Sequence, residues 1–196
     1  MQAKTLTRIA TVALLLISMP ALAATWRVDA AHSTLGFSNT YQDVTYNGQF
    51  RKFTAQIDYD PADLAYAKFD VTVDITSLDT QNSERDSTAL GADFFDTAKF
   101  PTAHFVTTAF RKAANGEVLA DGELTLRGVT KPVTLVVKFV PNGDGATLDV
   151  STQLQRLDFG IGTGQWADPS MIGNGVSVHA HLLLHAASRA TQGGQP

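Results

Sequence analysis

Three histidines near the carboxyl end have the spacing that comes closest to a metal site. His179, His181 and His185 fall on one face of a predicted strand, and histidines two residues apart can hold zinc. Val178 and Leu182 belong to the opposite, apolar face. The histidines are therefore expected to face solvent, and neither a carboxylate nor a cysteine stands at ligand spacing beside them. We predict no metal site.

His32 and Ser33 have the side chains of a general base and a nucleophile. Adjacent residues of a strand point to opposite faces, so the imidazole of His32 is not expected to reach the Ser33 hydroxyl. The chain also contains no G-x-S-x-G turn of the kind that exposes a catalytic serine. We predict that these residues are structural and that the protein has no catalytic residue.

A group of polar residues follows at Thr80, Asn82, Arg85 and Asp86. A buried guanidinium can satisfy a carboxylate and loop carbonyls at the same time, because its planar fork carries several donors. We predict that Arg85 and Asp86 form such a structural cluster and that replacing Arg85 destabilises the fold more than it changes ligand choice.

Composition removes several classes of function. The chain has 196 residues, no cysteine and a net charge of −4, and a length of this kind favours one domain. An acidic protein lacks the basic face that nucleic acids require, so no nucleic-acid partner is expected. Without cysteine there is no disulfide, cysteine-ligated zinc, iron–sulfur cluster or thiol nucleophile.

Both ends of the chain differ from the rest. Lys4 and Arg8 precede a short apolar run that Pro20 ends, and an A-x-A site closes at Ala23, which together predict a cleaved signal peptide over residues 1–23. The apolar run is shorter than the roughly 20 residues that span a membrane. We predict export, and residues 186–196 have the composition of a disordered tail. The folded domain is then residues 24–185.

The domain alternates apolar and polar residues almost throughout. Val71, Val73 and Ile75 alternate with polar neighbours, and about eight such runs follow one another with short turns between them. The phase of the alternation changes near Arg51 and Lys52, which indicates a bulge. These runs predict an antiparallel barrel or sandwich.

One segment interrupts the strands. Residues of about 82–95 are predicted to form a helical insert, because Asn82 or Ser83 can cap it and acidic residues occupy its first turn. Phe94 and Phe95 at its end can dock against the sheet.

Six short motifs occur along the chain in a recognisable order and spacing. They are His32-Ser33-Thr34-Leu35-Gly36-Phe37, Gly48-Gln49-Phe50, Thr80-Gln81-Asn82-Ser83-Glu84-Arg85-Asp86, Asp93-Phe94-Phe95-Asp96, Gly122-Glu123-Leu124-Thr125-Leu126-Arg127-Gly128 with the Val129-Thr130-Lys131-Pro132-Val133 that follows, and Arg156-Leu157-Asp158-Phe159-Gly160-Ile161. In these motifs the chain resembles the family of YceI-like proteins, and the likeness covers essentially residues 25–184.

The resemblance implies an all-β fold, an eight-stranded antiparallel lipocalin-like barrel, in a periplasmic protein that binds a long isoprenoid in its lumen. It also implies a homodimer and a membrane partner of the cytochrome b561 type, and through that partner a polyprenyl quinone as the ligand. No cofactor is expected beyond such a bound polyisoprenoid or quinone. The alternatives are a fatty acid or amide as the ligand, or an enzyme or redox accessory that acts on such a lipid.

A barrel of eight strands either packs its interior shut or holds one slender ligand. Because closing the sheet turns the apolar residues inward, we predict an apolar lumen that binds one long-chain apolar molecule. The alternative is that the same side chains pack against one another. The predicted wall residues are Phe37, Phe50, Phe53, Val71, Val73, Leu124, Leu126, Leu135, Val137, Val176 and Val178.

Overall fold

The computed structural model describes residues 24–187. The predicted signal peptide, residues 1–23, and residues 188–196 of the predicted tail lie outside the described residues. The last strand continues to Ala186, so the folded domain ends slightly later than the predicted boundary at residue 185. In the described part of the chain, no helix is long and apolar enough to cross a membrane.

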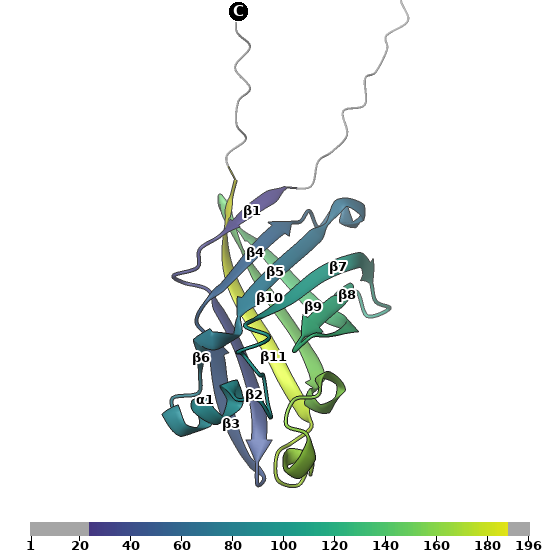
Figure 1. Ribbon diagram of the computed structural model, residues 1–196. Helices are drawn as coiled ribbons and strands as arrows, with labels where there is room; N and C mark the ends of the chain where they lie inside the picture. Colours follow the sequence, from purple (N-terminus) through teal and green to yellow (C-terminus); the bar gives the residue numbers. More distant parts are fainter. Residues whose placement is uncertain (1–23, 188–196) are drawn as a thin grey trace, which may run out of the picture.

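Eight strands close into an antiparallel barrel (Figure 1), as predicted. The ring runs β1-β4-β5-β7-β8-β9-β10-β11 and closes where Trp26 pairs with Ala186. The strands are β1 (Thr25–Val28), β4 (Phe53–Asp58), β5 (Lys68–Asp74), β7 (Thr102–Lys112), β8 (Val118–Leu126), β9 (Val129–Asn142), β10 (Gly145–Gln155) and β11 (Gly175–Ala186).

Three further strands extend the wall toward the lower end of Figure 1. They are β2 (Thr34–Tyr41), β3 (Val44–Phe50) and β6 (Leu78–Asp79), and they follow β11 in the order β2-β3-β6. Strand β3 ends at Phe50 and β4 begins at Phe53, so the change of phase at Arg51 and Lys52 is a break between two strands and not the predicted bulge within one strand. Strands β2, β3 and β6 therefore form part of the barrel wall at the lower end, and β1 and β4 form part of it at the upper end.

Two tight turns shape the open end of the barrel. Gln42 and Asp43 join β2 to β3 with φ of 48° and 61°, and Arg127 and Gly128 join β8 to β9 with φ of 49° and 73°. Left-handed conformations at both central residues match the twist of the flanking strands. Each hairpin consequently keeps its apolar residues in register on the inner face.

The helical insert is shorter than predicted. Helix α1 spans Ser83–Leu90, and the side chain of Asn82 caps it by accepting a hydrogen bond of 2.9 Å from the backbone N–H of Arg85. The helix stops because Gly91 takes an extended conformation, after which the chain turns back. Phe94 and Phe95 therefore reach the barrel from turns, where the sequence predicted helix.

Four short 3₁₀ helices complete the described structure. They are η1 (Leu64–Tyr66), η2 (Ile75–Ser77), η3 (Arg156–Phe159) and η4 (Gly164–Trp166). The last two belong to a long connection between β10 and β11 that wraps the lower end of the barrel (Figure 1). This connection lies opposite α1 in that view.

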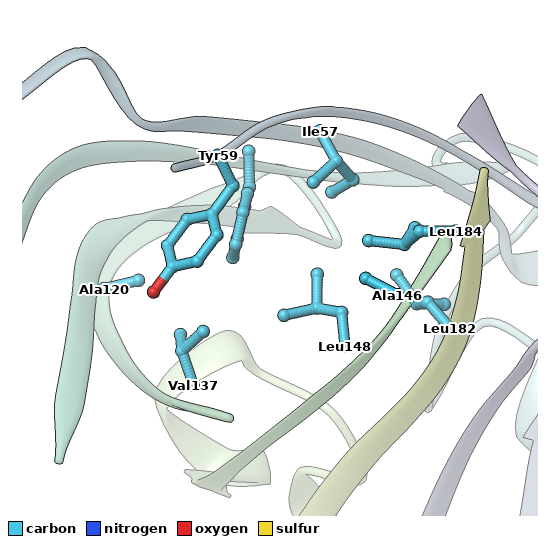
Figure 2. Close-up of a cluster of buried hydrophobic side chains, with 9 residues drawn as sticks. Ile57, Tyr59, Ala120, Val137, Ala146, Leu148, Leu182 and Leu184 are labelled. Atoms are coloured by element: carbon cyan, nitrogen blue, oxygen red, sulfur yellow. The ribbon is translucent and has the colours of Figure 1, made fainter. Parts of the chain in front are cut away.

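The upper end of the barrel is filled with side chains, and we call it the packed end (Figure 2). The ring of Tyr59 lies 5.0 Å from that of Phe139 and 5.8 Å from those of Phe69 and Phe110, measured between ring centroids. The indole N–H of Trp26 donates to the backbone oxygen of Tyr59 at 2.9 Å. Figure 2 shows the buried side chains of this end converging from several strands. The buried residues of the packed end are Ile57, Tyr59, Phe69, Ala120, Val137, Ala146, Leu148, Leu182 and Leu184.

Candidate functional site

Below the packed end the barrel is hollow. The cavity has a volume of about 680 Å³, and apolar side chains of the barrel strands form most of its wall. A cavity of this size falls in the range that holds a small-molecule ligand. We call this part of the barrel the hollow half.

Ten of the predicted wall residues line the cavity. Each is only partly buried, because the side chain faces open space, whereas residues of the packed end are almost completely buried. The prediction for Val137 is wrong: its side chain is buried in the packed end, where Ala120 and Tyr59 cover it. The ten lining residues are Phe37, Phe50, Phe53, Val71, Val73, Leu124, Leu126, Leu135, Val176 and Val178.

Two glycines keep aromatic rings close to the wall. A Cβ atom on Gly48 would lie 2.4 Å from Cζ of Phe37, and one on Gly122 would lie 2.6 Å from Cζ of Phe105. Such distances are impossible for real atoms, so only glycine lets either ring lie against the sheet. Both rings line the cavity while occupying little of it.

Phe94 and Phe95, which the sequence predicted as structural, also lie in the cavity wall. Phe95 meets Phe50 edge-on at 6.2 Å between centroids. Phe94 is buried against Trp166 at 5.6 Å, together with Phe159 and other apolar residues of the β10–β11 connection. The two phenylalanines thus attach the segment after α1 to both sides of the hollow half.

The mouth of the cavity lies between α1 and the β2–β3 hairpin. Tyr41, Asn82, Glu84 and Thr88 line the cavity and are at the same time exposed to solvent, which marks the opening. Most polar lining residues stand at this rim, whereas the rest of the wall is mainly aliphatic and aromatic and includes the polar Ser151 and Thr152 of β10. The cavity is therefore apolar inside and polar at its entrance.

Arg85 and Asp86 form the predicted hydrogen-bonded cluster with Thr80, but Arg85 is not a buried fork on a carboxylate. It is partly exposed and lines the cavity, where its Nε donates to Thr80 Oγ1 at 2.8 Å and its Nη2 donates to the Thr80 carbonyl at 3.2 Å. Asp86 instead accepts from the Thr80 N–H at 2.9 Å and from the Thr80 hydroxyl at 2.6 Å. Arg85 and Asp86 are consecutive on a helix, so they point in different directions and meet only through Thr80.

The buried arginine of this fold is Arg156, whose role the sequence analysis missed. Its side chain is 4% exposed, and it donates five hydrogen bonds of 2.6 to 3.1 Å to backbone carbonyls. One guanidinium thereby holds the β10–β11 connection in place. Its position just before a glycine-rich loop was the available signal. The acceptors are Gly173, Ile161, Gly162, Trp166 and Ile172.

Tyr46 lies beside Arg85 at the mouth. The Arg85 guanidinium carbon sits 4.6 Å from the centroid of the Tyr46 ring, a cation–π arrangement. Burial raises the pKa of the Tyr46 phenol, while the charges of Arg85 and Arg156 act in the opposite direction. A hydrogen bond with the Asn39 side chain also lowers the pKa of the phenol, but burial outweighs these effects and the phenol stays protonated at neutral pH.

The three histidines of β11 lie on the outer face. Nδ1 of His181 is 2.6 Å from Oδ1 of Asp149, Nε2 of His185 is 3.6 Å from Oδ2 of Asp29, and the ring of His179 covers Gly36. Each contacts a different segment: His181 contacts β10, His185 the connection after β1, and His179 strand β2. Among residues 24–187 no three histidine or acidic side chains gather as they would around a metal ion.

His32 and Ser33 also point in different directions. Nδ1 of His32 lies 2.9 Å from Oδ2 of Asp29, and the hydroxyl oxygen of Ser33 accepts a hydrogen bond of 3.0 Å from the backbone N–H of Leu183. The Ser33 bond holds the link between β1 and β2 against β11, whereas the His32–Asp29 contact lies within that link.

The comparisons with known proteins agree with this architecture. Residues 26–184 match the YceI-like domain family. A UPF0312 protein of Vibrio cholerae is 34% identical over 185 residues, which cover 88% of this chain and 98% of that protein. The crystal structure of BcnA from Burkholderia cenocepacia has a TM-score of 0.77 and 32% identity, covering 80% of this chain and 99% of that one.

A more distant structure is described as a polyisoprenoid-binding domain from Saccharophagus degradans. It has a TM-score of 0.64 and covers 84% of this chain and 99% of that one. Its 17% identity shows a shared fold.

Proposed function

Because this chain belongs to the family of YceI-like domains, we propose that it binds one long-chain isoprenoid or polyprenyl quinone in the hollow half and carries or sequesters it in the periplasm. The observation that carries the proposal is the apolar cavity of about 680 Å³, which the packed end closes and the polar mouth opens. The distant structural relative that is named for polyisoprenoid binding supports the choice of ligand class.

The apolar wall favours a long chain over a compact ligand. At about −0.3 kcal/mol per non-hydrogen atom, a chain of roughly 40 carbons reaches about −12 kcal/mol, which is near nanomolar affinity. Most of that free energy comes from removing apolar surface from water. Affinity should consequently rise with chain length until the cavity is full.

The test is a titration of delipidated protein with geraniol, farnesol and geranylgeraniol. Protein is extracted with organic solvent, refolded to the same melting temperature, and titrated by calorimetry. Affinity should increase along the series. No binding at any chain length would contradict the proposal.

A variant that fills the cavity sharpens this test. Ala180→Phe places a ring in the hollow half, where the Ala180 side chain lines the cavity, and should abolish binding of geranylgeraniol. Ala109→Phe adds the same ring to the exposed side of β7 and should leave binding unchanged.

The periplasmic location, the homodimer and a membrane partner of the cytochrome b561 type stay predictions. Intact mass of the exported protein tests the first of these. A chain that begins at Ala24 is expected, and a mass that retains residues 1–23 would contradict both cleavage and location.

A further inference from the structure

At the mouth of the cavity, Arg85 makes fewer hydrogen bonds than its guanidinium has donors. A guanidinium has five N–H donors. Arg156 uses all of its five on backbone carbonyls, whereas Arg85 uses two, both on Thr80. The remaining donors of Arg85 belong to a side chain that lines the cavity.

The charge of Arg85 is also unpaired. Within residues 24–187 no carboxylate lies at ion-pair distance from its guanidinium, and Asp86 is occupied by Thr80. Glu84 is the acidic residue of the cavity lining, and it is exposed, so water screens its charge. Arg85 is partly buried, and its field toward the cavity is screened less.

Tyr46 completes the arrangement. Its ring holds the Arg85 guanidinium at 4.6 Å, and it lines the same stretch of the mouth. This contact and the two hydrogen bonds to Thr80 hold the guanidinium in place, and a guanidinium held in place suits an acceptor with two oxygens, such as a carboxylate or a phosphate.

We propose that Arg85 and Tyr46 form a headgroup subsite for an anionic oxygen head, a carboxylate or a phosphate, on a chain whose tail fills the hollow half. This inference rests on the proposed function and adds to it the direction of the ligand and the chemistry of its end. The tail points to the packed end and the head lies at the mouth, where polar groups and solvent meet it. Among ligands of one chain length, those with an anionic head are selected.

The experiment compares ligands that differ only at the head. Palmitate is compared with hexadecanol, and farnesyl monophosphate with farnesol, by calorimetric titration of delipidated protein at pH 7.5. Hydrogen bonds to a charged group predict that the anion binds about 10- to 100-fold more tightly than the alcohol. If only palmitate binds more tightly than its alcohol, the site is specific for a carboxylate. If only farnesyl monophosphate does, the site is specific for a phosphate. Either result supports the proposal.

Variants at position 85 test whether Arg85 causes the preference for an anionic head. Arg85→Gln should bring the anion to within about twofold of the alcohol while the affinity for farnesol stays the same, and Arg85→Lys should keep part of the preference because it keeps the charge without the fork. Ser87→Ala, an exposed position of α1 outside the cavity lining, is the matched control and should behave as wild type.

The pH dependence of binding to the wild-type protein tests the proposal without a variant, so the test does not depend on Arg85→Gln folding correctly. As the pH falls below the pKa of the free palmitate head, its advantage over hexadecanol should shrink and be lost about two units lower, because tighter binding of the anion lowers the pKa of the bound head; a phosphate keeps a negative charge and its advantage. Equal binding of anion and alcohol to the wild type, or an equal loss of both in Arg85→Gln, would overturn the headgroup subsite alone. Failure of every ligand to bind would overturn the proposed function, and the subsite with it.

Discussion

The packed end and the hollow half are made of the same strands with the same alternation, yet one is full and the other empty. At the packed end, large rings from several strands meet at the centre, among them Tyr59, Phe69, Phe110 and Phe139. In the hollow half the rings of Phe37 and Phe105 lie against glycines in the wall. The direction of the aromatic rings, and not the apolar pattern, thus decides which half can hold a ligand.

The two halves are also stabilised differently. The packed end gains stability from interior contacts, because a buried side chain loses its contact with water and touches many neighbours. The hollow half has few contacts across its centre and relies on its rim, where Arg156 ties the β10–β11 connection and Thr80 joins Arg85 to Asp86. A binding cavity therefore coexists with a stable barrel because each half uses a different source of stability.

The largest effect on stability is expected at Arg156, which holds the β10–β11 connection at the rim. Arg156→Met should lower the free energy of unfolding by on the order of 3–5 kcal/mol, because it leaves buried carbonyls without donors. Chemical denaturation measures this. Arg27→Met, at an exposed position of β1, is the control and should be nearly neutral; a similar small effect of Arg156→Met would contradict the role given to the rim.

Replacing one leucine in each half by alanine, on neighbouring strands, compares the packing of the two halves directly. Leu184→Ala at the packed end should cost about 2–5 kcal/mol, because the side chain is 2% exposed and leaves a cavity behind. Leu154→Ala in the cavity wall should cost about 1 kcal/mol or less, because that side chain already borders open space. Equal costs in thermal or urea unfolding would mean that the hollow half is packed in solution.

A change at Gly48 should convert part of the hollow half into packed interior. In Gly48→Ala the new methyl group drives the Phe37 ring off the wall, which narrows the cavity and costs about 1–3 kcal/mol. We expect weaker binding of geranylgeraniol in titration with little change for geraniol. Gly175→Ala, where a Cβ meets only one distant atom, is the control. Unchanged binding in Gly48→Ala would show that the ring position does not set the width of the cavity.

The smallest expected effect is on the stability of the fold at low pH. Hydrogen bonds from Arg111, at 2.7 Å, and from Thr134 lower the pKa of Asp121, a surface carboxylate outside the packed end. A lowered pKa in the folded state gives stability that is present above the ordinary Asp pKa and is lost as the pH falls through the lowered value. Asp121→Asn should therefore reduce the loss of stability in acid, with a small amplitude because the ion pair is exposed.

Thermal melts from pH 7 to pH 2 check this prediction. Asp43→Asn, in the exposed β2–β3 turn, is the control, since asparagine also accepts its left-handed conformation. An acid transition of Asp121→Asn that coincides with that of wild type would contradict the contribution of this carboxylate.

The apolar pattern predicted an antiparallel barrel or sandwich and most of the inner wall, and the family resemblance selected the eight-stranded barrel. Alternation determines which side of a strand faces inward, so residues such as Val73 and Val178 could be placed on the cavity side from sequence alone. It could not predict how much of the interior is filled with side chains, because that depends on side chains from six strands meeting in space. Val137 was assigned to the lumen wall for this reason, although Tyr59 and its neighbours cover it.

The roles of the two arginines could not be separated from sequence. Both stand beside polar residues and near a change of secondary structure, and the motif around Arg85 looked like the buried cluster. Burial of Arg156 arises from the way residues 156–174 wrap around it, a loop path that no periodicity describes. Arg85, on the short helix α1, is left at the mouth of the cavity.

Native mass spectrometry of the protein, purified without detergent from a bacterial host, tests most directly whether the hollow half holds a lipid. We predict one additional mass per chain that corresponds to a long apolar molecule, is removed by organic solvent, and is missing in Ala180→Phe but present in Ala109→Phe. A protein of bare polypeptide mass that also gains no mass when it is incubated with geranylgeraniol, palmitate or farnesyl monophosphate would contradict the account.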